Sequence, residues 1–584
     1  MRQLNRLNQY QRLWQHSHGA IQRTCVAELA VRCFCSERHL RTLLTQWQQA
    51  GWLRWRGEPG RGKLGTLTFF RNPEALRQEL LQTRLQTGNA TEALQMLDVA
   101  PERLVNLLRP LMGGHWQNDA PVLRIPYYRP LESVQPLVIG GRAEQHLVRQ
   151  LYSGLTRFEQ DEPVGDLALH WQHDEDGRSW LFWLRPQLCW HNDEPLQAQQ
   201  LIARFRLILE DSRARQLLAD VETIDAPHPL ALRFWLRRSD YWLAHRLAHL
   251  LCLLPHPQVP QTGSGAWKLV HFSPKLVRIE SNTRWHLQQP LMQAVEYWIT
   301  PELFVRGLGT SCRHPVQIAI GDADELASLR PVSRSVSLGF CYLVCRPRPG
   351  FSAAQARSVF RLIQQSGIIA RLPLEEGLIS PSKTLLPGWP VPLMKHENVR
   401  LPRQLTLHYH LPVELHEMSQ ALRQLLLEQG CELTIVFHDV KSWQHIKGLD
   451  KADLVMGDRL IGDAPLFTLA SWLQTDRLWR PLWRTRTGAE VLQRLAAIQH
   501  IAASDERAEA LHQLCQQLMH DGILLPLFNY RYQISAPPGV EGIQLNTMGW
   551  FDFSRAWIPP PLSEQDSAKA KHAAAVQQRA KPLP

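Results

Sequence analysis

The chain has 584 residues, of which 44% are hydrophobic and 20% are charged, so it is long enough for several domains and a large core. Because no apolar run approaches the roughly 20 residues that span a bilayer, the composition argues against a membrane-embedded protein. The net charge is +11, and residues 1–75 hold twelve Arg or Lys against four Glu, which favours a polyanionic partner for this segment alone.

The first fifty residues contain three short predicted helices. Apolar residues recur every three or four positions from Leu4 to Trp14, which predicts an amphipathic helix. Thr24 is expected to cap a second helix. After a break at residues 33–35, Ser36 is expected to cap a third helix that ends near Gly51. The inner face of this third helix is predicted to comprise Leu40, Leu43, Leu44 and Trp47.

A predicted β-hairpin follows the helices. Residues 52–56 and 66–70 are strand-like and enclose a turn rich in glycine. The glycine pattern from Gly60 to Gly65 leads into a strand and not into a helix, so we interpret it as a wing turn and not as a dinucleotide site. Three helices followed by a basic hairpin predict a winged helix-turn-helix that binds double-stranded DNA.

The candidate DNA contacts lie on the third helix and on the wing. Arginines near the start of a recognition helix can bond to guanine, and basic wing residues can contact phosphates. The alternatives are a solvated basic face without a ligand and a polar helix that docks on protein. The candidates are Ser36, Glu37, Arg38, His39, Arg41, Thr42, Arg54, Arg56, Arg61 and Lys63.

The sequence divides into four predicted parts. Residues 1–72 form the DNA-binding domain, and residues 73–117 form a helical connector. Alternating strand and helix patterns predict an α/β sensor domain over residues 118–560. Residues 561–584 are rich in Ala, Lys, Gln and Pro and have almost nothing to bury, which predicts a disordered tail.

Catalytic and metal motifs give weak signals. Cys33 and Cys35 with His39 lack the paired cysteines of a structural zinc site. There is no nucleophile elbow or Walker loop, and the carboxylates of residues 174–176 lie beside Gly177 as in a turn. We therefore expect no enzyme, no cofactor and no metal, although an enzyme on a binding-protein scaffold stays open.

The sensor domain resembles the family 5 solute-binding proteins. The resemblance rests on residues 165–171, 176–186, 190–196 and 263–267. It implies a two-lobed α/β domain of the type II periplasmic-binding-protein-like fold that binds a small-molecule effector. Residues 453–465 are similar to a segment that lines the family's cleft. With one of the 21 tryptophans, they give the candidate ligand residues Trp285, Asp458, Arg459 and Asp463.

Nearly the whole chain, apart from the tail, resembles the SgrR type of transcriptional regulator. The segments that carry this closer match include residues 12–15, 35–44, 60–63, 127–131 and 548–553. The resemblance implies a regulator that senses a sugar phosphate or related metabolite and controls a small RNA gene and its own gene. The N-terminus lacks the apolar core of a secretory signal, which predicts a cytoplasmic protein without a membrane partner. The alternative is a transport-associated peptide- or solute-binding protein without a regulatory role.

Overall fold

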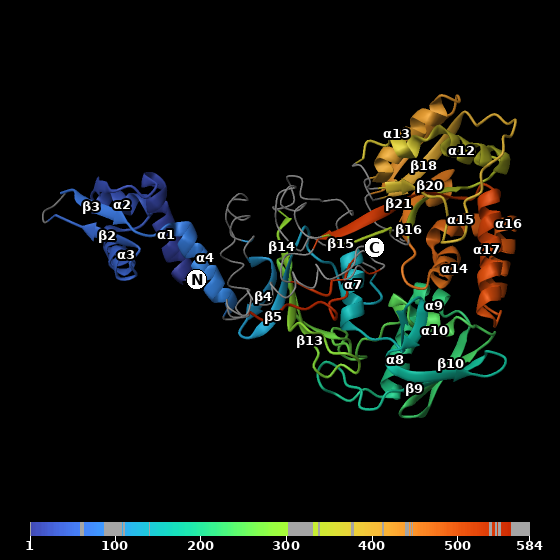
Figure 1. The fold of residues 1–584 in the computed structure, drawn as a ribbon, viewed down its shortest axis with the longest axis horizontal. Coiled ribbons are helices and arrows are strands. Elements are labelled where there is room, and N and C mark those ends of the chain that lie inside the picture. Colours follow the sequence, from blue (N-terminus) through green and yellow to red (C-terminus); the bar gives the residue numbers. More distant parts are fainter. Residues whose placement is uncertain are drawn as a thin grey trace, which may run out of the picture. The chain divides into compact units, whose positions relative to one another are not determined.

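A computed structural model describes residues 2–58, 63–86, 108, 111–138, 141–301, 331–336, 339–374, 379–410, 414–438, 443, 446, 448–535, 540–543, 546 and 550–561. The chain forms two compact units, residues 1–120 and 121–584 (Figure 1). Residues 59–62 of the predicted wing segment, most of the predicted connector and residues 562–584 of the predicted tail lie outside the described residues.

The first unit contains the predicted three helices and hairpin. A third strand, β1, pairs antiparallel with β3, so that the sheet order is β1-β3-β2. This strand was not predicted, because three residues carry too little pattern. The elements are α1 (Arg2–Ser17), β1 (Gln22–Thr24), α2 (Val26–Arg32), α3 (Glu37–Gln49), β2 (Leu53–Arg56), β3 (Gly65–Phe69), α4 (Pro73–Gln86) and β4 (Gly113–Gln117).

The ends of α2 and α3 differ in how well the sequence predicted them. Ser36 caps α3 as expected, because its side chain accepts a hydrogen bond from the amide of His39. Thr24 does not cap α2. The N-cap is Cys25, and the Thr24 hydroxyl instead donates to Glu28 Oε2 at 2.6 Å. A capping hydroxyl would accept from a backbone amide of the first turn, whereas this hydroxyl donates to the charged carboxylate of Glu28.

The core of the first unit joins its helices to its sheet. The hydroxyl of Tyr10 in α1 donates to the carbonyls of Trp52 at 2.8 Å and Arg71 at 2.7 Å. Helix α4 is fixed to α1 by the buried Arg77, whose guanidinium donates to Asn8 at 2.7 Å and Gln11 at 2.9 Å. The first turns of the predicted connector therefore belong to the folded first unit.

The second unit begins with a mixed sheet and a four-stranded antiparallel sheet. In the first, β14 pairs parallel with β5 and antiparallel with β13, which pairs with β12. In the second, the order is β10-β11-β9-β8. The elements are β5 (Ala120–Tyr127), α7 (Arg142–Leu151), β6 (Thr156–Glu159), β7 (Glu162–Gly165), β8 (Ala168–His173), β9 (Ser179–Leu184), α8 (Ala198–Glu210), α9 (Ser212–Leu217), β10 (Val221–His228), β11 (Ala231–Leu236), α10 (Leu243–Leu247), η2 (Leu250–Cys252), β12 (Trp267–Phe272), β13 (Leu276–Ser281) and β14 (Ala294–Ile299).

A seven-stranded sheet organises the rest of the second unit. Its order is β15-β21-β16-β20-β18-β19, with β17 paired to β21. Strand β18 runs parallel to β19 and β20. The elements are β15 (Pro331–Val336), β16 (Gly339–Cys345), α12 (Ala353–Ser366), η4 (Ile368–Arg371), β17 (Ile379–Pro381), β18 (Gln404–His410), α13 (Glu414–Leu427), β19 (Glu432–His438), η5 (Leu449–Lys451), β20 (Leu454–Leu460), α14 (Pro465–Thr475), η6 (Arg477–Trp479), α15 (Arg480–Trp483), α16 (Arg486–Ile498), α17 (Ser504–His520) and β21 (Leu524–Ser535).

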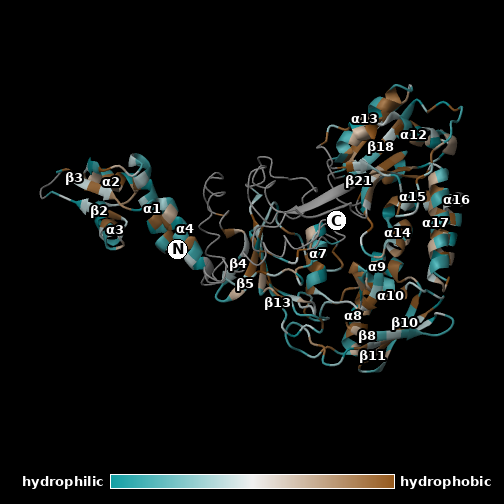
Figure 2. Ribbon diagram, viewed as in Figure 1, coloured by the Kyte–Doolittle hydropathy of each residue, from teal (hydrophilic) through white to brown (hydrophobic). Residues whose placement is uncertain are grey.

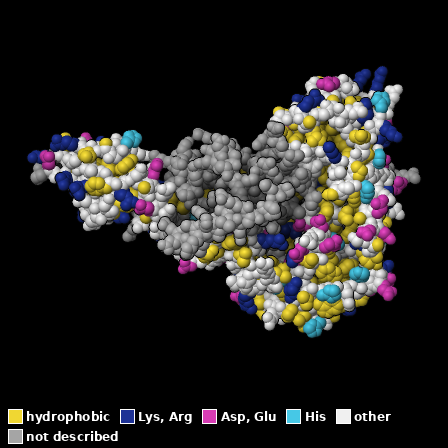
Figure 3. All heavy atoms as spheres, in the orientation of Figure 1, with side chains coloured by type: hydrophobic (Ala, Val, Ile, Leu, Met, Phe, Trp, Pro, Cys, Tyr) yellow, Lys and Arg dark blue, Asp and Glu magenta, His cyan; other side chains and the backbone are white. Residues whose placement is uncertain are grey.

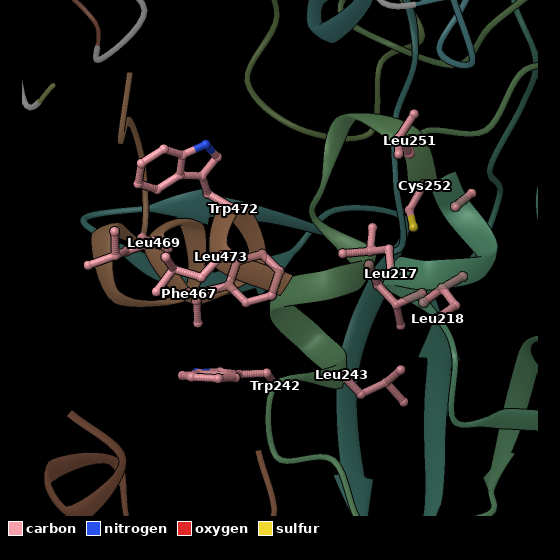
Figure 4. Packing of buried hydrophobic residues seen from close by; sticks show 14 of the residues in the cluster. Leu217, Leu218, Trp242, Leu243, Leu251, Cys252, Phe467, Leu469, Trp472 and Leu473 are labelled. Carbon is pink, nitrogen blue, oxygen red and sulfur yellow. The ribbon is translucent and has the colours of Figure 1, made fainter. Parts of the chain in front are cut away.

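Alternate residues of β16 belong to two different cores. Cys341 and Leu343 pack with α12 and α13, whereas Phe340 and Tyr342 pack with α14. The second of these cores continues to the helices beside the four-stranded sheet, where Trp242 meets Phe467 edge to face at 6.1 Å (Figure 4). Helices α16 and α17 present many hydrophilic residues (teal in Figure 2). Within the described residues, we find no helix that combines the length and the apolarity needed to cross a membrane.

Candidate DNA-binding surface and ligand cavity

The recognition-helix candidates lie on the exposed side of α3. Leu40, Leu43, Leu44 and Trp47 are buried, as predicted. Ser36, Glu37, Arg38, His39, Arg41 and Thr42 are all exposed. Arg41 forms an ion pair with Glu37 at 3.1 Å, and both side chains are more than half exposed. Such a pair contributes little to stability, so a phosphate can displace Glu37 from Arg41 at small cost.

The wing candidates are also exposed where the structure describes them. Arg54 and Arg56 are two residues apart on β2 and share its outward face, whereas Leu53 is buried. The Arg54 guanidinium lies over the ring of Phe70, 5.4 Å from its centroid. Lys63 is exposed, and Arg61 lies outside the described residues. In Figure 3, Lys and Arg side chains (dark blue) occur at several edges of the first unit.

A cavity of about 450 Å³ in the second unit is large enough for a small metabolite. Side chains from α7, from the segment after β13 and from the chain after β20 line it, together with residues near 550. Two of the candidate ligand residues, Trp285 and Asp463, are in this wall. The chain after β20 is positioned by Asp161, whose carboxylate accepts from the amide of Ala464 at 3.1 Å.

Arg149 brings a positive charge to the wall of the cavity. Its Nε is buried without a hydrogen-bond partner, and its guanidinium forms no ion pair within the described residues. Arg157 also lines the cavity, but Glu159 neutralises it at 2.8 Å. The indole Nε1 of Trp285 is a second buried donor with no acceptor among the residues that the structure describes. An anionic group with several acceptor oxygens would satisfy such donors.

Two buried histidines near Arg149 remain neutral. Burial lowers the pKa of His146 to about 3, and its Nε2 donates to the carbonyl of Phe551 at 2.9 Å. Burial also lowers the pKa of His249 to about 3, and the positive charges of Arg149 and Arg459 lower it further. Arg149 and Arg459 therefore both disfavour the protonated form of His249. Neither histidine adds positive charge beside Arg149 at neutral pH.

Asp458 and Arg459 do not line the cavity. Asp458 is engaged in an ion pair with Arg142 at the start of α7, at 2.9 Å. Arg459 follows it on β20, so their side chains point to opposite faces of the sheet. The sequence did not single out Arg149, because an arginine on an amphipathic helix looks like an ordinary surface residue. What distinguishes it is that no carboxylate among the described residues forms an ion pair with it.

The comparisons with known sequences match both parts of the chain. Residues 5–119 match the family described as "Sugar transport-related sRNA regulator N-term", and residues 162–307 match "Bacterial extracellular solute-binding proteins, family 5 Middle". The uncharacterized protein YbaE of Escherichia coli (strain K12) is 51% identical over 96% of this chain and 100% of its own length. The HTH-type transcriptional regulator SgrR of Photorhabdus laumondii is 27% identical over 94% of this chain and 98% of its own length.

Solved structures of other proteins are similar in fold to about three quarters of this chain. NikA from Brucella suis, in complex with Fe(III)-EDTA, has a TM-score of 0.62 and 14% identity, and covers 75% of this chain and 100% of its own. DppA from Helicobacter pylori, in complex with the peptide STSA, has a TM-score of 0.61 and 13% identity, and covers 75% of this chain and 98% of its own. These likenesses confirm the predicted periplasmic-binding-protein-like fold.

Proposed function

Because this chain belongs to the SgrR type of transcriptional regulators, with an N-terminal DNA-binding region and a family 5 solute-binding domain, we propose that it regulates promoters in response to a small anionic metabolite of the sugar-phosphate class. Its targets would include a small RNA gene and its own gene, and it would act in the cytoplasm, where promoter DNA is found. The description of the N-terminal family, which names sugar transport and small RNA, supports this proposal.

Arg149 is the observation that carries the ligand proposal. It is a cation in the wall of a metabolite-sized cavity, and no described carboxylate neutralises it. Its buried Nε lacks a hydrogen-bond partner within the described residues, so a bound anion that accepts from this nitrogen would stabilise the folded protein. Trp285 would supply a donor and an apolar ring face, which suits the hydroxyl groups and the C–H face of a sugar.

The DNA-binding proposal assigns separate roles to helix and wing. Arg38 and Arg41 would contact bases or nearby phosphates, assisted by Ser36, Glu37, His39 and Thr42. Arg54, Arg56, Arg61 and Lys63 would bind the backbone of double-stranded DNA. Ligand binding would alter DNA affinity only if the ligand prefers one of two conformations of the chain. Helix α4 is the natural element for this coupling, because Arg77 fixes it to α1.

A thermal-shift titration tests the ligand class. The full-length protein is mixed with hexose phosphates, free hexoses, or di- and tripeptides. We expect hexose phosphates to raise the unfolding midpoint, since a ligand at a hundred times its dissociation constant adds about 2.7 kcal/mol of stability. Arg149→Gln should abolish this shift, whereas Arg157→Gln, which removes an arginine already paired with Glu159, should weaken it much less.

Three results would count against this proposal. A midpoint raised by peptides and not by phosphates would favour a transport-associated peptide-binding role. An equal rise of the midpoint with hexose and with hexose phosphate would show that the phosphate group, and therefore its contact with Arg149, contributes nothing to binding. Retention of the full shift in Arg149→Gln would place the anion elsewhere.

A further inference from the structure

The first unit carries an exposed apolar patch that DNA contact does not explain. Its three large members are Phe34, Val31 and Ile21, whose exposed fractions are 83%, 73% and 68%. Val31 lies on α2 four residues after Ala27, so both are on one helix face, and both are exposed. Arg32 donates to the side chain of Gln22 at 2.9 Å, which holds the segment containing Ile21 beside the end of α2.

Phe34 also adopts an unfavourable backbone conformation. Its φ is +50°, in the left-handed region that favours glycine. It occupies the turn between α2 and α3, where a glycine would satisfy the same geometry without strain. The chain therefore keeps an exposed aromatic ring at a position where glycine would make the folded state more stable. Strained residues of this kind cluster at functional contacts.

The charges around the patch restrict what can cover it. The guanidinium of Arg12 stacks on the Phe34 ring at 5.1 Å and forms no ion pair within the described residues. A second copy of the chain in a two-fold contact would place Arg12 close to the Arg12 of its partner, which is repulsive. A phosphate backbone would suit Arg12 but would leave Ile21, Val31 and Phe34 against a polar surface. A protein with an apolar pocket and carboxylates at its rim matches both features.

We propose that Phe34, Val31, Ile21 and Arg12 form a docking surface for a protein of the transcription machinery that has an acidic-rimmed apolar pocket. Phe34 is the central anchor, and Arg12 orients its ring and pairs with a carboxylate of the partner. Because Phe34 stands two residues before the cap of α3, a partner seated here is held next to the DNA that α3 contacts. This inference rests on the proposed regulatory function and adds the means by which the bound protein acts on transcription.

Variants in cells separate docking from DNA binding. Genome-wide occupancy and transcript levels are compared for the wild type, Phe34→Gly and Leu393→Ala. The last is a matched control, because Leu393 is equally exposed, at 83%, but lies in the second unit. We expect Phe34→Gly to occupy the same sites to the same extent, while activated transcripts from those sites fall about tenfold, the usual loss when an aromatic anchor is removed. Leu393→Ala should leave both readouts unchanged.

A direct test uses purified RNA polymerase holoenzyme. The photoreactive residue p-benzoylphenylalanine replaces Phe34 in the full-length protein, bound to promoter DNA recovered from the occupied sites. Irradiation should attach the protein to one subunit of the holoenzyme, and Arg12→Ala should reduce the yield severalfold. Sedimentation of the wild type and Phe34→Gly is measured in parallel, and the same oligomeric state is expected for both.

Each other outcome overturns the docking surface. Loss of occupancy in Phe34→Gly would place the patch in the DNA interface. A change of oligomeric state would identify a second copy as the occupant. Unchanged transcripts together with no crosslink to the holoenzyme would show that the patch has no such partner. If the wild type occupies no sites at all, the proposed regulatory function itself fails, and this result is distinct from the others.

Discussion

Single buried residues of the second unit connect its stability to pH. His249 caps η2, and its Nδ1 accepts from the amide of Leu251 at 3.2 Å, so this nitrogen must stay unprotonated in the folded state. Burial, with nearby arginine charges, lowers the pKa of His249 to about 3. The unfolded chain returns the group to a pKa of about 6.5. The folded state therefore loses stability as pH falls below that value, down to about pH 3.

The pH dependence can be assigned to this residue. His249→Asn keeps an acceptor for the Leu251 amide but cannot take up a proton. Between about pH 6 and about pH 5, its free energy of unfolding should fall less steeply than that of the wild type, by up to ~1.4 kcal/mol per pH unit, which corresponds to one proton. Urea unfolding of the full chain at several pH values measures this slope. An unchanged slope would mean that His249 titrates normally in the folded state.

Arg41 is the residue at which the DNA contact is best tested. Only an exposed, weak pair with Glu37 holds it in the free protein. Arg41→Ala should lower affinity for operator DNA and reduce the slope of log K against log salt by about 0.9 if one phosphate contact is lost. Arg423→Ala, an exposed arginine of the second unit, carries the same charge change and should alter neither quantity. The recognition role of α3 is contradicted if the two variants behave alike.

At the scale of elements, periodicity predicted the helices of the first unit and the two longer strands of its hairpin. Local signals were weaker where tertiary contacts decide the outcome. Strand β1 forms because β3 offers it a ladder, and Thr24 bonds to Glu28 although its residue type favours a cap. The cavity was least predictable, since its wall joins segments that are hundreds of residues apart, such as Arg149 and Asp463. The spacing of residues along the sequence does not show whether an arginine in the cavity wall forms an ion pair with a carboxylate.

The cap of α3 is an element-scale feature with a measurable contribution. Ser36→Ala removes the oxygen that accepts from the His39 amide and should destabilise the first unit by about 1 kcal/mol. For a unit of this size, its calorimetric midpoint should fall by about 5 °C. Ser36→Asp retains an acceptor and should restore the midpoint. If Ser36→Ala melts like the wild type, the cap bond contributes nothing to stability.

For the whole molecule, regulation requires that the ligand and DNA sites influence each other. Linkage makes this reciprocal, since the factor by which ligand changes DNA affinity equals the factor by which DNA changes ligand affinity. In Arg77→Met, we expect the affinity for ligand alone and the affinity for DNA alone to stay within about threefold of the wild type. The factor by which ligand changes DNA affinity should approach one, because α4 then loses its bonds to Asn8 and Gln11. Titrations of ligand with and without DNA measure it. A preserved factor would assign the coupling to another element.

The apolar core shared by the four-stranded sheet and α14–α17 has a consequence for incomplete chains. Its members extend from Leu155 to Leu524, so neither half of this sequence can bury its hydrophobic side chains alone. A premature stop codon before α14 would remove Phe467 and leave Trp242 and its neighbours facing water, on a polypeptide whose DNA-binding unit is already complete. Such fragments should be insoluble or degraded in the cell, and this protects promoters from occupation by a regulator that has lost its sensor.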